Sequence, residues 1–169
     1  MIKPKNKVPE LQLDLINDTK WILENQKPEK YTLIVFYRGL HCPVCKKQLQ
    51  DLASKTEDFK SRGVNVIAVS MDTEKRAKLS AEKWETGDLP IGYGLSEDNA
   101  REWGLYISHS VKDPEPEVFS EPGMFLIRAD GTLYFSSIQT MPFARPELDA
   151  VLKAIDFVEK EDYPARGGK

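Results

Sequence analysis

The chain has few of the residues that mark a secreted scaffold or a metal protein. Its 169 residues include only two cysteines and two histidines. Two cysteines cannot form the disulfide framework of a small secreted domain. A zinc site would need about four ligands, and His41 is adjacent to Cys42 and badly placed to share a tetrahedral metal with it. We therefore expect no metal and no cofactor, and a local chemical role for the cysteines.

A long apolar segment is also missing. The longest apolar run covers residues 33–37, far below the roughly 20 residues of a membrane span, and the early lysines are followed by no apolar stretch of a signal peptide. The net charge is only −3, with no long run of either sign, which argues against nucleic-acid and membrane partners. The 40% hydrophobic content suffices for one core. We predict a single soluble, cytoplasmic domain over residues 1–169.

Apolar patterns in the first half of the chain predict a strand, a helix and a second strand. Residues 32–37 and 64–71 are β-branched runs without polar alternation, as in strands covered on both faces. Between them, residues 43–61 repeat apolar positions at helical spacing, with Pro43 suited to the first helical position and Gly63 after the last. The three segments form a βαβ unit, so their strands should be parallel.

The remaining elements complete an α/β fold. We predict a helix capped by Asp72 and running to about Trp84, a short strand at 89–95, a helix capped by Ser96 and ended by Gly104, and a loop at 110–122. A hairpin at 123–138 turns at an Asp-Gly pair, and an amphipathic helix follows from Arg145 onward. Segments 11–16 and 19–23 should form a leading hairpin. The predicted architecture is a central mixed sheet flanked by helices, with an N-terminal β-hairpin extension and a helical insertion before the last hairpin.

The CPVC motif lies at the first turn of the helix predicted at 43–61. There the unpaired N–H groups and the macrodipole favour a thiolate over a thiol. Cys42 is the natural nucleophile, and Cys45, one turn deeper on the same face, is the natural resolving thiol. Two buried core cysteines, or a cysteine hydrolase with His109 as base, are the alternatives. Three neighbouring cations are predicted to stabilise the thiolate: Arg38, His41 and Lys46.

The element order and the CxxC at the strand–helix junction resemble the thioredoxin-like superfamily. In that resemblance "EPGMFLIRADGTLYF" matches the second signature, with Pro122 in the cis-proline position facing the disulfide. A cis bond would let Glu121 pair with an extended substrate strand opposite Cys42. An ordinary loop proline is the alternative interpretation of Pro122.

Read from "FY" onward, the stretch "FYRGLHCPVCKKQL" resembles the AhpC/TSA peroxiredoxins. In this register Arg38 replaces their proline, Cys42 replaces their threonine and Cys45 takes the peroxidatic position, while their later arginine has no clear counterpart near Pro122. With "WGLYIS", "PFARP" and "DYPARG", the chain is most similar to the peroxiredoxin-like branch that carries a CxxC. "PFARP" is interpreted either as a specificity loop or as a segment that closes the core, and Arg145 within it receives no role.

These observations leave three functional hypotheses. The first is a thiol–disulfide oxidoreductase, with a protein or small-molecule disulfide as substrate and a cellular dithiol as reductant. The second is an antioxidant peroxidase that reduces hydroperoxides through the same cysteines. The third is a non-catalytic redox sensor or binding module.

Overall fold

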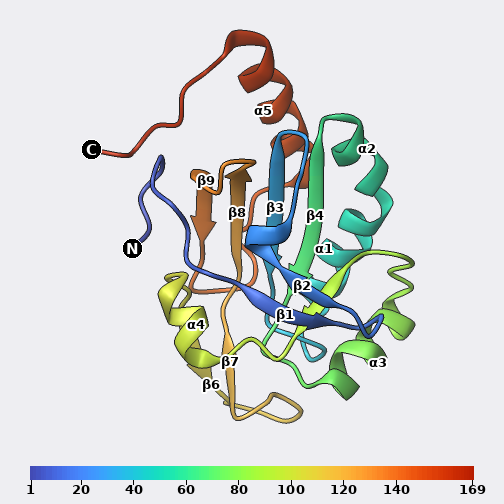
Figure 1. Ribbon diagram of the computed structural model, residues 1–169. Coiled ribbons are helices and arrows are strands. Elements are labelled where there is room, and N and C mark those ends of the chain that lie inside the picture. Colours follow the sequence, from blue (N-terminus) through green and yellow to red (C-terminus); the bar gives the residue numbers. More distant parts are fainter.

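A computed structural model of residues 1–169 has a seven-stranded mixed sheet at its centre (Figure 1). The strand order is β2-β1-β5-β4-β3-β8-β9, in which β3 pairs parallel with β4 and β4 parallel with β5, while the other neighbours are antiparallel. The predicted mixed sheet, parallel βαβ unit and leading hairpin are therefore confirmed. The strands are β1 Gln12–Leu15, β2 Lys20–Ile22, β3 Tyr31–Phe36, β4 Val64–Val69, β5 Ile91–Tyr93, β8 Gly123–Arg128 and β9 Leu133–Ile138.

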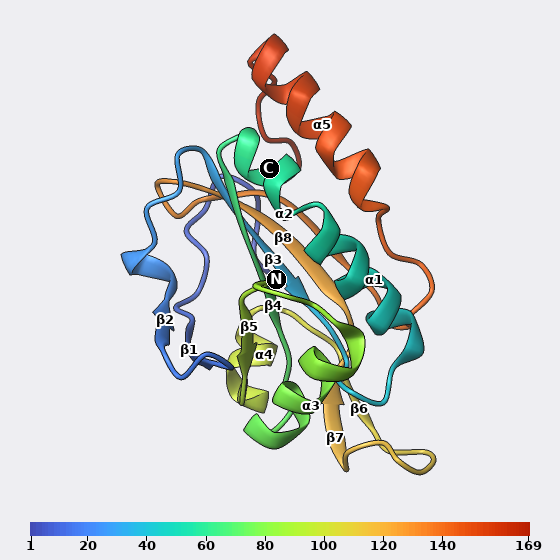
Figure 2. The same cartoon turned by 90° about the vertical axis from the view of Figure 1, so that its right-hand side faces the viewer.

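Helices cover both faces of this sheet (Figure 2). One face packs against α1 (Pro43–Ser54), α2 (Thr56–Ser61), α3 (Glu74–Trp84) and α5 (Leu148–Glu161), and the other against α4 (Glu97–Glu102) and the N-terminal segment. A short 3-10 helix, Leu23–Asn25, follows β2, and a separate two-stranded sheet joins β6 (Ile107–His109) to β7 (Val118–Ser120). None of the helices combines the length and the apolar character that crossing a membrane requires.

The central strand β3 supplies both cores and leads directly to the CPVC motif. All six of its residues are buried, as the β-branched run predicts. Leu33 and Val35 face the core under α1 and α5, whereas Ile34 and Phe36 face the core around Trp103. Because the strand is held on both faces and by both neighbouring strands, the residues that follow it start from a fixed position.

The helix predicted over residues 43–61 is in fact two helices. Lys55 leaves the helical conformation, with φ −107° and ψ 5°, and its N–H donates to the carbonyls of Asp51 and Leu52. The Thr56 hydroxyl donates to the carbonyls of Leu52 and Ala53. These bonds satisfy the last carbonyls of α1, so the helix ends there and α2 begins in a new direction.

Two other local predictions were wrong. Thr73, rather than Asp72, caps α3 by accepting a hydrogen bond from the N–H of Arg76. The segment predicted as a loop at 110–122 contains β7, which pairs with β6 in the register Ile107↔Ser120. Pro114 and Pro116 fall in the turn between the two strands and Pro122 follows β7, so no proline interrupts the pairing.

Candidate functional site

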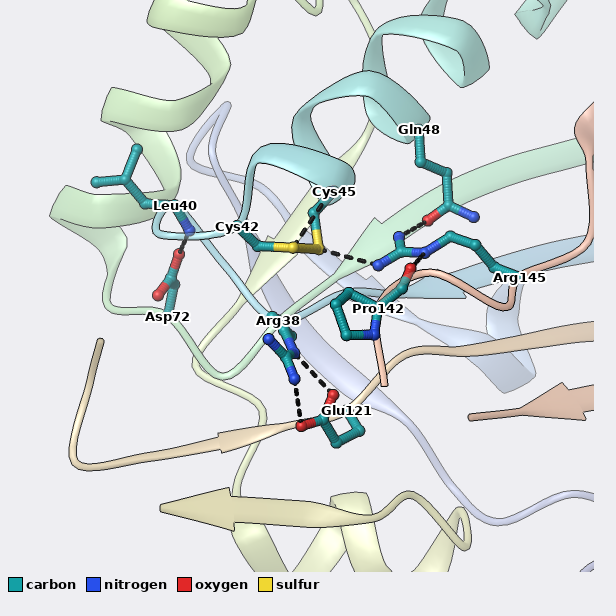
Figure 3. The surroundings of a disulfide bond; sticks show 9 residues. All are labelled: Arg38, Leu40, Cys42, Cys45, Gln48, Asp72, Glu121, Pro142 and Arg145. Atoms are coloured by element: carbon teal, nitrogen blue, oxygen red, sulfur yellow. Dashed lines mark hydrogen bonds and ion pairs between the residues drawn. A yellow bond between two sulfur atoms is a disulfide. The ribbon is translucent and has the colours of Figure 1, made fainter. Parts of the chain in front are cut away.

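The two cysteines lie at the N-terminus of α1, where β3 ends, and are joined by a disulfide (Figure 3). Their Cα atoms are 5.2 Å apart. Cys42 is the N-cap residue, Pro43 follows it at the first helical position, and the Cys42 sulfur accepts the N–H of Cys45 at 3.2 Å. Cys42 is 3% exposed and Cys45 is fully buried. The predicted placement of the two cysteines at the N-terminus of a helix is confirmed.

The loop between β3 and α1 is held by the buried carboxylate of Asp72. Its Oδ2 accepts the N–H of Leu40 at 2.8 Å (Figure 3), and its Oδ1 accepts Nε of Arg76 at 3.0 Å. Gly39 carries the loop over this carboxylate with φ +134°, a conformation that L side chains rarely adopt. The carboxylate expected to cap α3 thus fixes the turn that leads to Cys42.

Gly39→Ala is expected to lower the free energy of unfolding by about 1–3 kcal/mol, because of the strained φ and a steric clash. A Cβ there would lie 2.6 Å from Oδ1 of Asp72. Urea denaturation measures the loss. Gly87→Ala is the control: Gly87 also has a positive φ of +57° but nothing within 4 Å of the added Cβ. If both variants lose the same stability, the contact with Asp72 does not constrain the loop.

Arg145 brings a guanidinium to the disulfide from the segment before α5 (Figure 3). Its Nη2 donates to the sulfur of Cys45 at 3.3 Å, its Nε donates to the carbonyl of Pro142 at 2.6 Å, and its Nη1 donates to Oε1 of Gln48. All three donor groups are therefore engaged, and the side chain is fixed in its orientation toward the sulfur. Arg145, which had no predicted role, is the cation that contacts the cysteine pair.

The charge of Arg145 persists at neutral pH. Burial, and then the nearby charge of Arg38, lower its pKa to about 10, while Glu121 opposes this shift. A guanidinium with this pKa is still protonated at pH 7. A positive charge in hydrogen-bond contact with a sulfur favours the thiolate, so reduction of the disulfide would leave Cys45 beside a stabilising cation.

A second arginine, Arg38, is bound by the buried carboxylate of Glu121. Nε of Arg38 donates to Oε2 at 2.7 Å and Nη2 donates to Oε1 at 2.8 Å, a bidentate pair (Figure 3). The Ser108 hydroxyl donates to Oε1 at 2.7 Å, and the Arg38 guanidinium lies over the ring of Phe119, 5.3 Å from its centroid. This ion pair connects the loop between β3 and α1 to the β6–β7 sheet.

The three cations predicted to stabilise the thiolate do not contact either sulfur. Arg38 is neutralised by Glu121. His41 packs on Phe119 with its centroid 4.7 Å away, both its ring nitrogens lack a partner, and burial lowers its pKa, so it adds no positive charge at neutral pH. Lys46 is exposed to solvent, where a charge is strongly screened. Their proximity in sequence did not bring their charges to the sulfurs.

The cis bond expected between Glu121 and Pro122 is also corrected. The peptide bond between them is trans, the usual state of an X-Pro bond; the cis peptide of this chain is Asp113–Pro114. The N–H of Glu121 donates to the carbonyl of Tyr106 at 2.8 Å, and the carbonyl of Pro122 accepts from Gln139 at 3.0 Å. Because the N–H of Glu121 already has a partner within the protein, it is not free to donate to a substrate strand.

Together, the mixed sheet, the helix that follows its central strand and the paired cysteines at that helix's N-terminus define a thioredoxin-like, thiol-based oxidoreductase. The family comparison is consistent with this. The AhpC/TSA family model matches residues 4–136. The chain belongs to the AhpC/TSA family and is an enzyme of its peroxiredoxin-like branch.

Individual relatives are distant. The chain is 25% identical to the Bacillus subtilis protein YkuU, named as a peroxiredoxin, over 80% of this chain and 74% of that one. It is 26% identical to peroxiredoxin-2 of Cricetulus griseus, over 79% and 66%. Among solved structures, a peroxiredoxin 6 of Arenicola marina aligns with a TM-score of 0.82 at 19% identity, covering 96% of this chain and 76% of that chain. Peroxidoxin BcpB of Mycobacterium tuberculosis aligns with a TM-score of 0.76 at 16% identity, covering 94% and 99%. These structures confirm the predicted thioredoxin-like fold.

Proposed function

We propose that this protein is a thiol peroxidase that reduces small hydroperoxides, with Cys45 as the sulfur oxidised first and Cys42 as its resolving partner. The observation that carries the proposal is the guanidinium of Arg145, 3.3 Å from the Cys45 sulfur. Cys45 is also the cysteine that the peroxiredoxin register puts in the peroxidatic position, so the contact supports this assignment. The position of the cysteines at the N-terminus of the helix had indicated the opposite order, with Cys42 as the nucleophile and Cys45 as the resolving thiol.

The oxidation proceeds in two balanced steps. The Cys45 thiolate attacks one peroxide oxygen, so an S–O bond forms and the O–O bond breaks; the sulfur loses two electrons, and the departing oxygen takes a proton to leave as an alcohol or water. Cys42 then attacks the sulfenic sulfur, forming the disulfide and releasing water. The Cα separation of 5.2 Å lies within the range that a disulfide spans.

A dithiol reductant restores the thiols. Cys42 is the more exposed of the two cysteines, so a reductant thiolate would attack its sulfur, form a mixed disulfide there and displace Cys45. Arg145 stabilises this leaving thiolate, because a leaving group with a low pKa departs faster. One guanidinium thus assists both halves of the cycle. A reducing compartment such as the cytoplasm would supply the dithiol.

Burial of the sulfurs supports a small substrate. A hydroperoxide needs only to reach one sulfur. A protein substrate would instead need an open backbone edge beside the cysteines of this protein, on which its own chain could align. The N–H of Glu121, which was predicted to pair with such a substrate, already donates to the carbonyl of Tyr106. This observation favours the peroxidase over a general protein-disulfide reductase.

Stopped-flow mixing of the reduced protein with hydrogen peroxide or an alkyl hydroperoxide tests the proposal. We expect oxidation about 10²–10⁴ times faster than that of a free cysteine thiol, and a product that has lost two hydrogens and resists alkylation at both cysteines. Reduction of a disulfide substrate is measured in parallel on the same protein. Oxidation no faster than that of a free thiol would rule out the peroxidase.

A further inference from the structure

The Arg38–Glu121 pair has no part in the cycle described above, although it lies beside the cysteine site. Glu121 is 2% exposed, and its carboxylate accepts two guanidinium hydrogen bonds and the Ser108 hydroxyl. A buried ion pair is weak evidence for stability, because desolvation offsets much of the attraction between its charges. The stability of the fold therefore does not by itself explain why this pair is present.

The pair is electrostatically coupled to the cation at the sulfur. Arg38 disfavours the protonated state of Arg145, and Glu121 favours it. The three side chains come from separate segments, the β3–α1 loop, the β7–β8 junction and the approach to α5, and Figure 3 shows all three around the disulfide. Together they carry one net positive charge, which complements one thiolate.

We infer that Glu121 is a positioning residue that binds Arg38 and so limits the positive charge presented to the cysteine pair to that of a single guanidinium. With Glu121 in place, the reduced site is balanced when one cysteine is ionised and the other is a thiol, as both the peroxide step and the resolving step require. Without it, two guanidinium groups would act on the sulfurs. This inference rests on the proposed function in taking Cys45 as the reactive thiolate.

Other charges face the same loop. Asp72 and Arg76 pair with each other beneath residues 39–40, Glu115 lies toward His41 from the turn between β6 and β7, and Lys46 is exposed on α1. Asp72 and Arg76 neutralise one another, and the charge of Lys46 is screened by solvent. Besides Arg145 itself, Arg38 and Glu121 are therefore the residues whose replacement we expect to change the charge near the sulfurs.

The test is the pH titration of the Cys45 thiolate, followed by its ultraviolet absorbance in the Cys42→Ser background. Glu121→Gln is nearly isosteric and removes the carboxylate charge, so we expect the titration midpoint to fall by about 0.5–1 pH unit. Arg38→Met combined with Glu121→Gln restores the wild-type net charge and should return the midpoint to the wild-type value. The readout needs no peroxide, so this inference can fail while the peroxidase stands, and the reverse.

Ser108→Ala is the matched structural control. It removes one hydrogen bond to Glu121 without changing charge, and we expect the midpoint to stay within about 0.2 pH unit of wild type. Should Glu121→Gln not fold, Glu121→Asp keeps the charge but withdraws it by one methylene, and the midpoint should again fall. An unchanged midpoint in the folded Gln or Asp variant, or a double variant as shifted as Glu121→Gln, would overturn the inference.

Discussion

Cys45→Ser is expected to abolish the rapid reaction with hydroperoxide, lowering its rate by about 10³-fold or more. Serine has no ionised nucleophile at neutral pH, and the guanidinium of Arg145 would face a hydroxyl instead of a sulfur. Cys42 remains in this variant. Its sulfur still accepts the N–H of residue 45, but no cation contacts it. Stopped-flow fluorescence or competition with a reference peroxidase measures the remaining rate.

Cys42→Ser provides the contrast. It should keep the first oxidation within about threefold of wild type, because the Cys45–Arg145 contact is untouched. The reaction should then stop at a sulfenic acid on Cys45, detectable by mass as a dimedone adduct, since no thiol is present to condense with it. The opposite pattern, with a fast step kept in Cys45→Ser and lost in Cys42→Ser, would make Cys42 the first nucleophile.

Local sequence patterns were sufficient for most of the fold. The buried run of β3, the Asp-Gly turn between β8 and β9 and the Ser96 cap of α4 depend on neighbouring residues, and all three were predicted. The pairing of β7 with β6, from Ile107↔Ser120 to His109↔Val118, joins segments with weak strand patterns across an intervening turn. Such short strands form through tertiary contacts, which periodicity does not report.

In the site, too, the features that depend on neighbouring residues were predicted and those that depend on distant residues were missed. The CPVC motif is contiguous, so the cysteine pair and its helix could be predicted. Arg145 is 100 positions from Cys45 in the sequence, and nothing in "PFARP" states which residue it contacts. An arginine in an otherwise apolar segment between a turn and a helix was the available signal, since such a cation needs a partner when buried. Conversely, Arg38 was taken as a free cation because its partner, Glu121, is distant in sequence.

Arg145→Gln is expected to slow the oxidation of Cys45 by about 10²-fold and to raise its thiol pKa by about 1–2 units. The glutamine amide is too short to replace the contacts with Gln48 and the Pro142 carbonyl, and it carries no charge to stabilise the thiolate. Reduction of the disulfide should slow as well, because Cys45 becomes a poorer leaving group. The peroxide rate measured across pH separates the two effects: a loss that shrinks at high pH reflects thiolate population, and a constant loss reflects transition-state stabilisation.

Arg145→Lys and Arg101→Gln complete the comparison. Lysine keeps the charge but cannot make the three-point contact, so we expect an intermediate rate and a thiol pKa nearer to wild type. Arg101 is an exposed arginine on α4 that pairs with Glu97 on the far face of the sheet, and its loss should change neither quantity. If Arg145→Gln oxidises as fast as Arg101→Gln, the guanidinium at the Cys45 sulfur does not activate it, and the choice of Cys45 as the first sulfur loses its physical basis.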